Sequence, residues 1–282
     1  MMEDATRDGS DTLLVGVSNP DTAHRLVELA GLTTRERPWE ILLTHVVTVA
    51  DQISLTTGQS SPEVVRARDF LQETKARASE AGVECRALVE VARSVEDGLL
   101  AAAESRRASM ILVGFSEKEA PSAEMEAEEG RFDRTMHKVA RKADADVVVA
   151  KFRKDGMDRV LVPVAAKAHL QVAGFLCRVL GALERTTLTF LHVVEPGAPE
   201  EEARQRVAAR LREKGIASFG KLVVITSEDP LDAIVHEAAS HDLMIIGPSG
   251  RPGFIQTIFS SKAERLAEEA PASVLLVWNR KD

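Results

Sequence analysis

Glycines and hydroxyl side chains gather in one stretch that could hold an anion, GPSGRPGFIQTIFSSK, residues 247–262. It directly follows the apolar run LMII and leads into a segment with helical periodicity. A glycine loop before a helix can bind phosphate, because its backbone N–H groups point outward and the helix N-terminus carries about half a positive charge. Gly247 and Gly250 permit a close approach that a Cβ would block. The stretch predicts phosphate binding by Gly247, Gly250, Ser260 and Ser261.

A second interpretation of the same stretch needs no ligand. The sequence Ser261-Lys262-Ala263-Glu264 has the pattern of a capping box, in which the serine and the glutamate satisfy the first N–H groups of their own helix. Gly-Pro-Ser-Gly is also typical of an ordinary turn. Both interpretations stay open on the sequence alone.

Other chemistry is not supported by the residue pattern. The chain has no GxxxxGK[ST] phosphate loop and no GxSxG nucleophile motif, and its seven histidines are scattered. His45 and His192 follow the same HVV pattern, and we interpret both as structural rather than catalytic. His236 and His241 lie close together without a third metal ligand. We therefore expect no enzyme, no catalytic residues and no metal site.

Composition excludes further classes of function. The formal net charge of −8 argues against a broad nucleic-acid surface, which needs clustered Lys and Arg. Tyrosine is absent and aromatic residues make up 4% of the chain, so stacking platforms for single-stranded nucleic acid are not expected. The polar N-terminus lacks the features of a signal peptide, and no apolar run approaches the roughly 18 residues of a membrane helix. Cys85 and Cys177 stand alone, as in a reducing compartment. We expect a soluble cytoplasmic protein.

The sequence contains an internal repeat of two similar copies. TLLVGVSNP from Thr12 parallels RVLVPVAAK from Arg159, and EILLTHVV from Glu40 parallels LTFLHVV from Leu188. ASMILVGFS parallels HDLMIIGPS, and DADVVVAKF parallels PASVLLVWN. The length of 282 residues also favours two cores. We place the boundary in the polar stretch RKDG, so that the predicted domains are residues 1–152 and 153–282.

Each copy alternates buried strands with helices. Short runs of Val, Ile and Leu without polar alternation indicate strands covered on both faces, and segments with a 3.6-residue period separate them. Pro199 and the glutamates after it begin one such helix, which Gly215 ends. The pattern predicts an α/β fold of two doubly wound parallel-sheet domains in tandem. The runs VVVAKF and VLLVW end the copies and would protect their edges by pairing, which predicts an internal pseudo-dimer.

These features together resemble a tandem universal stress protein over nearly the whole chain. The resemblance rests on the repeat, on HVV after the second strand, on the strand-to-GxxG junction and on the terminal strand. It implies adenine-nucleotide alpha-hydrolase-like domains, and dimers formed through the last strand; a homodimer of the whole chain stays open. The family motif has three glycines and a final Ser or Thr, of which Gly247, Gly250 and Ser261 match, while Ser260 replaces the third glycine.

The resemblance implies binding of ATP where that motif is intact. Nucleotide-binding members usually carry an acidic residue after the first strand, where this chain has Ser18 and Ala165. Loss of one hydrogen-bonding partner costs about 1 to 3 kcal/mol. The second copy is therefore expected to bind nucleotide weakly or with altered preference, as ATP, ADP or AMP with Mg²⁺.

The first copy has a different loop. Residues 114–138 hold seven carboxylates and four basic residues, with Glu117, Asp133 and Arg134 in place of motif residues. A triphosphate would be repelled there, so no nucleotide is expected in this copy. The role predicted for the chain is a stress-linked binding or signalling module. The alternatives are an interaction, structural or regulatory protein that binds no nucleotide and acts on a protein partner, and a slow nucleotide hydrolase.

Overall fold

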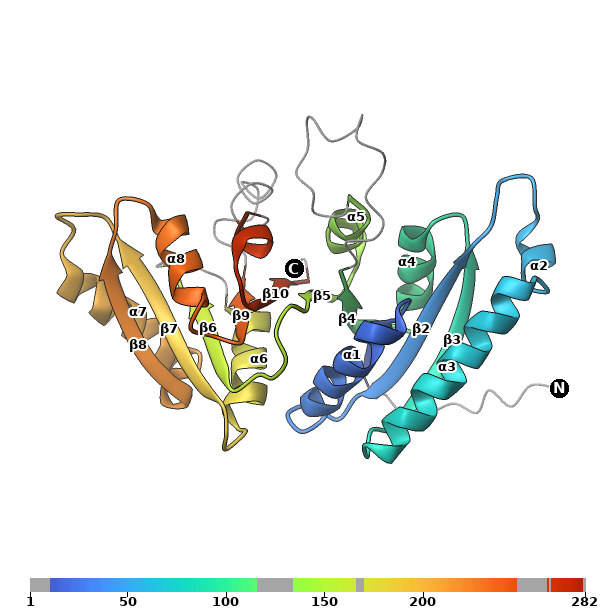
Figure 1. Cartoon of the computed structure of the whole chain (residues 1–282), viewed down its shortest axis with the longest axis horizontal. Coiled ribbons are helices and arrows are strands. Elements are labelled where there is room, and N and C mark those ends of the chain that lie inside the picture. Colours follow the sequence, from blue (N-terminus) through green and yellow to red (C-terminus); the bar gives the residue numbers. More distant parts are fainter. Residues whose placement is uncertain (1–10, 116–133, 166–169, 248–262, 264, 281–282) are drawn as a thin grey trace. The chain divides into compact units, whose positions relative to one another are not determined.

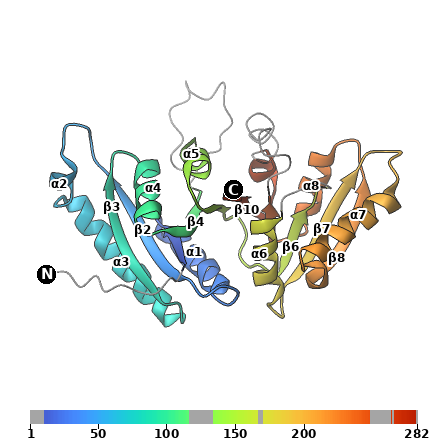
Figure 2. The same cartoon turned by 180° about the vertical axis from the view of Figure 1, so that it is seen from behind.

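The computed structural model describes residues 11–115, 134–165, 170–247, 263 and 265–280 (Figures 1 and 2). Within these residues, strands and helices alternate along the chain as predicted. They form two compact units, each described here by itself. The first takes its residues from Met1–Val113 and Arg141–Ala145, and the second from Gly114–Ala140 and Asp146–Asp282.

The first unit is a parallel sheet in the order β3-β2-β1-β4. Strand β1 lies at the centre of this sheet, and its apolar residues Leu13, Leu14 and Val15 are completely buried. Helices α1 and α3 lie together on one face of the sheet, and α4 packs against the other (Figures 1 and 2). The elements are β1 (Thr12–Gly16), α1 (Pro20–Thr33), β2 (Glu40–Thr48), α2 (Leu55–Gly58), α3 (Pro62–Glu80), β3 (Cys85–Ala92), α4 (Val95–Ser105) and β4 (Ala108–Gly114).

Local sequence fixes where the helices of this unit begin. The side chain of Asn19 accepts a hydrogen bond from the Asp21 N–H, and those of Ser61 and Ser94 cap α3 and α4 in the same way. Proline at the first position of α1 and α3 suits a helix start, where its missing N–H is not needed. These caps direct the chain from the carboxyl end of each strand into the following helix.

The second unit repeats this arrangement in the order β5-β10-β9-β6-β7-β8. All its strand pairs are parallel except β5 with β10. The doubly wound α/β fold predicted from the sequence is confirmed. Two elements precede the second copy, α5 (Arg134–Lys142) and β5 (Asp146–Lys151). The others are β6 (Arg159–Pro163), α6 (Gln171–Gly181), β7 (Thr187–Val194), α7 (Glu200–Glu213), the 3₁₀-helix η3 (Ala217–Phe219), β8 (Gly220–Thr226), α8 (Pro230–Ala238), β9 (Leu243–Ile246) and β10 (Ser273–Trp278).

The two terminal strands pair as predicted. Strand β10 is antiparallel to β5, with Leu275 opposite Ala150 and Leu276 opposite Val149. On its other side β10 is parallel to β9. Strand β5 ends the first sequence copy, yet it falls in the second compact unit. The sequence boundary near residue 152 stays a prediction, because it concerns where the copies meet rather than where the strands pack.

Both cysteines are core thiols, as expected. Cys85 and Cys177 are free and buried. Burial in apolar surroundings disfavours the thiolate; it raises the pKa of Cys85 and raises that of Cys177 to about 12. Neither thiol is therefore activated for chemistry at neutral pH. In the part of the chain that the structure describes, no helix is long and apolar enough to cross a bilayer.

Asp242 ties the beginning of β6 to the beginning of β9, and its replacement should change the pH dependence of stability. Its carboxylate accepts hydrogen bonds from the Arg159 backbone N–H at 2.9 Å and from Arg159 Nη2 at 2.7 Å. The bonded guanidinium lowers the pKa of Asp242 below its ordinary value of 3.8. Stability from a carboxylate with a lowered folded-state pKa is present above the unfolded pKa and is lost as the pH falls through the folded pKa. We expect Asp242→Asn to lower the urea midpoint at neutral pH, and its deficit against wild type to shrink below about pH 4.

Urea titrations at neutral pH and near pH 3 measure this difference. Asp69→Asn is the matched control, because Asp69 is an exposed carboxylate on α3. It should leave the midpoint unchanged at both pH values. A deficit of Asp242→Asn that is as large in acid as at neutral pH would contradict a stabilising role of the charged carboxylate.

Candidate functional site

Gly247 lies where the predicted anion loop begins, at the carboxyl end of the second sheet. It directly follows β9, whose four residues are all buried, and is itself half-buried. Strands β6, β7, β9 and β10 run parallel, so their carboxyl ends meet at this one edge. Open α/β sheets bind ligands at such an edge. Gly250, Ser260 and Ser261, the other predicted site residues, lie outside the described residues.

In each copy, a histidine ring is hydrogen-bonded to the main chain at the carboxyl edge of the sheet. His192 Nδ1 lies 2.7 Å from the carbonyl oxygen of Val164, which follows β6. In the first unit, His45 Nδ1 lies 2.9 Å from the carbonyl oxygen of Val17, which follows β1. The N–H donates to the carbonyl in both, so each ring fastens the end of one strand to its neighbour. Each ring thus satisfies Nδ1 within the chain, which agrees with a structural role.

His45 is further held as a neutral ring. Burial is the main cause that lowers its pKa, and the bond to the Val17 carbonyl opposes this only in part. The ring also meets Phe70 edge to face, with centroids 5.7 Å apart. A neutral imidazole with Nδ1 bound to a carbonyl keeps Nε2 as an acceptor. This arrangement orients the ring and adds no charge to the edge of the first sheet.

The residues after the first strand of each copy carry no charge. Ala165 is exposed after β6, and Ser18 is exposed after β1. Neither can supply a carboxylate to a ligand at the carboxyl edge. At both positions the structure therefore has a small, uncharged and exposed side chain.

Asn279 is a site residue that sequence reasoning missed. It follows β10, and its Oδ1 accepts a hydrogen bond from the Val172 N–H at 3.1 Å. Helix α6 has no side-chain cap of its own at Leu170, so this distant amide satisfies a donor of its first turn. The only signal in the sequence is an asparagine directly after an apolar strand. The N-terminus of α6 is thus partly occupied from within the chain.

The helix that follows the candidate loop is fixed at its C-terminal end. Residue Ala263 and residues 265–269 are helical. The Arg153 guanidinium donates to the carbonyl oxygens of Ala267, Glu268 and Ala270 at 2.7, 2.7 and 3.0 Å. A cation at helix C-terminal carbonyls interacts favourably with the helix dipole. Arg153 thereby holds the element on which an anion loop would depend.

In the first copy, the backbone N–H that follows the corresponding glycine is hydrogen-bonded to the main chain. Gly114 ends β4, and the N–H of the next residue, Phe115, donates to the Ala150 carbonyl at 2.8 Å. Lys151 Nζ lies 5.0 Å from the centroid of the Phe115 ring. The first backbone N–H after this glycine is therefore not free for a phosphate. The acidic loop with Glu117 and Asp133 lies outside the described residues, and so does the side chain of Arg134.

Metal ligands do not gather in the described ranges. Among those residues, no three side chains of His, Cys, Asp or Glu are arranged to hold a metal ion.

Comparison with known proteins identifies the family. The family model described as the universal stress protein family matches residues 9–151 and again 156–277. A universal stress protein from Archaeoglobus fulgidus has a similar fold, with a TM-score of 0.64 at 18% identity, covering 97% of this chain and 100% of that one. A protein of unknown function from Pseudomonas aeruginosa PAO1 also gives a TM-score of 0.64, at 15% identity over 96% of this chain and 94% of that one. At these identities the likeness concerns the fold alone. No curated protein matches the chain. Because the family model covers both copies, the chain belongs to the universal stress protein family, with two of its domains in tandem.

Proposed function

We propose that this chain is a cytoplasmic binding module of the stress response, without catalytic activity, whose second copy binds an adenine nucleotide weakly. The observation that supports it most is the position of Gly247. This glycine directly follows β9, at the carboxyl edge where three other parallel strands of the unit also end. A phosphate can approach the backbone most closely at a glycine, and this edge is the usual ligand side of the fold.

The two copies should differ in binding. In the first copy, six of the seven carboxylates in residues 114–138 precede Gly130. These charges disfavour a phosphate by repulsion. Gly250, Ser260 and Ser261 follow Gly247 in the second copy and would complete the phosphate loop, with Ser261 presenting its hydroxyl. One site per chain is therefore proposed.

The uncharged residue at the carboxyl edge of the second sheet determines the affinity and the nucleotide preference that we expect. Ala165 offers no carboxylate to a nucleoside, and losing such a partner costs about 1 to 3 kcal/mol, or roughly 10- to 100-fold in affinity. Ser260 stands where the family motif has its third glycine, which is a second change that disfavours nucleotide. Binding of AMP or ADP in preference to ATP, with Mg²⁺ carried by the phosphates, fits both changes.

Replacing Gly247 by valine is expected to weaken nucleotide binding by at least about tenfold, because the Cβ branches would occupy the space nearest the phosphate. Isothermal titration with AMP, ADP and ATP, each with and without Mg²⁺, measures affinity and stoichiometry. Gly114→Val is the matched control, since Gly114 ends the corresponding strand of the first copy. It should leave binding unchanged. No saturation at millimolar nucleotide, or equal loss in both variants, would refute the proposal.

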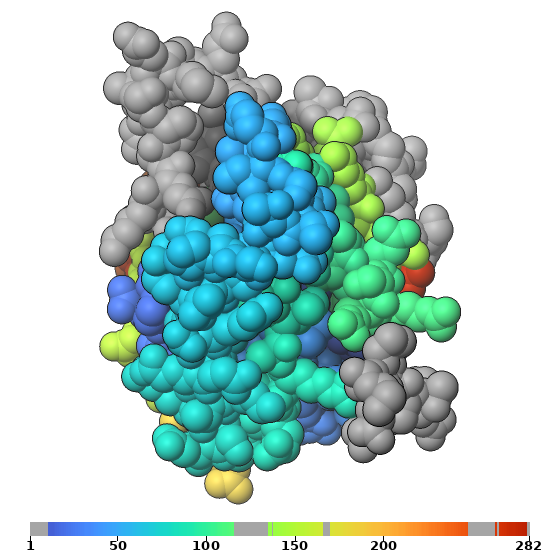
Figure 3. All heavy atoms as spheres, turned by 90° about the vertical axis from the view of Figure 1, so that its right-hand side faces the viewer, coloured from blue at the N-terminus to red at the C-terminus, as the bar shows by residue number. Residues whose placement is uncertain are grey.

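A second candidate function is recognition of a protein partner without any nucleotide. It is favoured by three large apolar side chains on the first unit, Ile53, Leu55 and Val65, which are 44%, 42% and 52% exposed. Arg93 Nη1 donates to the carbonyl oxygens of Val49, Ala50 and Ile53, so the loop that leads to α2 is held in place. Figure 3 looks onto this side of the first unit, where α2 and α3 lie in front of the strands. This second function would fit a chain that binds no nucleotide in the calorimetric titration but still binds a protein partner through these apolar side chains.

A further inference from the structure

Strand β3 lies at the edge of the sheet in the first unit. In the described part of the chain it pairs with β2 alone, so the backbone N–H and C=O groups on its outer side have no strand to bond to. Figure 3 looks onto this edge, where α3 lies to one side and α4 to the other. Such a row of unpaired backbone groups is a template for pairing with another strand.

The side chains of β3 place one charge on each side of a leucine. Arg86 is exposed, and Leu88 and Glu90 are half-buried. Because side chains alternate between the two faces of a sheet, these three residues form one row on the same face. Val89 points to the other face, where it packs against the buried cluster that includes Val64 of α3. The row therefore lies on the face that α3 does not cover.

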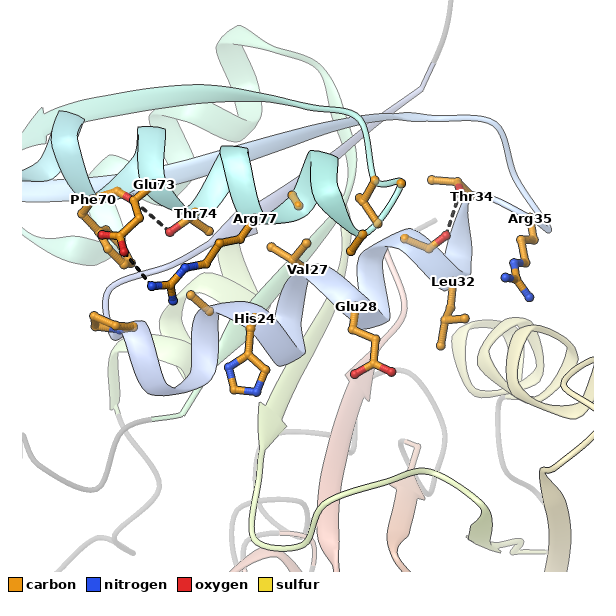
Figure 4. A pocket seen from close by; sticks show the side chains of 17 residues that line it. His24, Val27, Glu28, Leu32, Thr34, Arg35, Phe70, Glu73, Thr74 and Arg77 are labelled. Atoms are coloured by element: carbon orange, nitrogen blue, oxygen red, sulfur yellow. Dashed lines mark hydrogen bonds and ion pairs between the residues drawn. The ribbon is translucent and has the colours of Figure 1, made fainter.

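The two charges of this row can reach a partner. Arg86 Nε lies 2.7 Å from Glu40 Oε1 on β2, which leaves the other two guanidinium nitrogens as donors. Among the described residues, the Glu90 carboxylate forms no ion pair. Glu73 and Arg77 of α3 pair with each other and are turned toward α1 instead (Figure 4). They do not neutralise the row at the edge.

A second copy of β3 fits this row when the two strands pair antiparallel about Leu88. Two-fold symmetry then places Leu88 opposite itself and Arg86 of each chain opposite Glu90 of the other. Opposite charges that face each other across an antiparallel pair are favourable, and like charges are unfavourable. The pairing thus contains two ion pairs, one on each side of a leucine contact.

The neighbouring symmetric registers lose this match. Pairing about Ala87 would place Glu84 opposite Glu90, so that like charges repel. Pairing about Val89 would place each Arg86 opposite an alanine and each Glu90 opposite a leucine. The charges therefore select one register among those centred near the middle of the strand.

The corresponding edge strand of the second unit has a different pattern. The matched histidines of β2 and β7 align β3 with β8. In this alignment Lys221 takes the place of Arg86, and Ile225 takes the place of Glu90. Lys221 is the only charged residue in the sequence of β8. No pairing of β8 with itself therefore brings opposite charges together, and the self-complementary row belongs to the first unit.

Exposed apolar side chains lie near one end of the same edge. Ile53 and Leu55 are in or next to α2, and α2 contacts β3, since a Cβ on Gly58 would lie 3.2 Å from Val91 Cγ1. In the second copy, residues 195–199 alone join β7 to α7, so the fold does not require an α2 in this connection. The first copy thus adds apolar surface beside the strand that carries the matched charges.

We propose that two copies of this chain associate through the edge of β3, as an antiparallel pair with Leu88 on the two-fold axis. The partner is a second copy because the row of charges is complementary to itself. The contact extends the sheet of the first unit from one chain into the other. It involves neither β10 nor the carboxyl edge at Gly247, so it does not depend on nucleotide.

Sedimentation equilibrium of the full chain should show a reversible dimer with a dissociation constant on the order of 10 to 100 µM. Arg86→Glu and Glu90→Arg each place like charges opposite each other twice, and each should weaken dimerisation at least about tenfold. An equimolar mixture of the two variants should dimerise within about threefold of wild type, because both mixed pairs again join an arginine to a glutamate. Lys221→Glu, at the corresponding position of β8, is the matched control and should dimerise as wild type does.

Cross-linking tests the register. Leu88→Cys should be captured as a covalent dimer by a short bis-maleimide, because residues directly opposite each other have Cβ atoms roughly 5 Å apart. Val223→Cys is the matched control, since Val223 takes the place of Leu88 in β8 and is also half-buried. It should stay monomeric under the same conditions.

Several results would overturn the proposal. They are a chain that stays monomeric up to millimolar concentration, a dimer that neither charge variant weakens, a mixture of the variants that associates no better than either alone, or cross-linking at residue 223 instead of residue 88.

Discussion

Replacing Leu276 by proline is expected to prevent the second unit from folding. Leu276 is 2% exposed at the middle of β10, opposite Val149 on β5 and Ile246 on β9. A proline there supplies no N–H to the ladder, and proline is found essentially only at sheet edges or bulges. Hydrogen exchange followed by mass spectrometry should show loss of protection across β6 to β10. Strands β1 to β3 of the first unit should stay protected, since none of them pairs with β10.

Leu276→Ala separates the lost side chain from the lost backbone pairing. It should lower the free energy of unfolding by about 2 to 5 kcal/mol, the usual range for a buried leucine, while the unit still folds. If the proline variant is protected as well as the alanine variant, the pairing of β10 with its two neighbours does not hold the unit together.

The same strand bears on assembly. Pairing of β5 with β10 inside one chain covers the edge through which a single-copy member would be expected to meet a second chain. An exposed apolar strand edge is a template for further pairing, and this one is already used. A homodimer of the whole chain would need another surface. The exposed apolar side chains at residues 53–65 provide one candidate for it.

The fold could be predicted from sequence because the patterns that indicate it are local and occur in both copies. The run LMII is buried on both faces because helices cover both sides of a parallel strand, and all four of its residues are buried. Pro199 and Gly215 mark the ends of α7, since one suits a helix start and the other takes a positive φ of 66° after its end. Buried strands and helix ends depend on a few neighbouring residues, so they can be predicted without knowing which distant residues they contact.

The candidate site could be predicted only in part. The position of Gly247 after a buried strand followed from the sequence, whereas Gly250, Ser260 and Ser261 lie outside the described residues and remain predictions. The contact of Asn279 with α6 joins residues 107 apart and leaves no local pattern.

The predicted linker is also more firmly held than its polar sequence indicates. Ser273, which begins β10, accepts hydrogen bonds from the backbone N–H groups of Arg153 and Lys154, each at 3.0 Å. Its hydroxyl donates to the Lys154 carbonyl at 3.0 Å. Lys154 Nζ in turn donates to the carbonyl oxygens of Ala239 and His241 at 2.9 and 2.7 Å. The backbone of residues 153 and 154 is therefore fastened to the second unit, although Arg153 is exposed.

Ser273→Ala should lower the free energy of unfolding by about 2 to 5 kcal/mol, because Ser273 is 1% exposed and its loss leaves two backbone N–H groups and a carbonyl without this partner. Each partly buried group left unsatisfied costs about 1 to 3 kcal/mol, and water can reach some of them. Chemical denaturation of the full chain measures the change. Ser240→Ala is the matched control, since the exposed Ser240 hydroxyl donates to the Glu237 carbonyl at 3.0 Å and its loss should cost at most about 0.5 kcal/mol. Equal destabilisation by the two variants would mean that the buried hydroxyl does not fasten the segment between the copies, and that Arg153 reaches the helix beyond the candidate loop without its help.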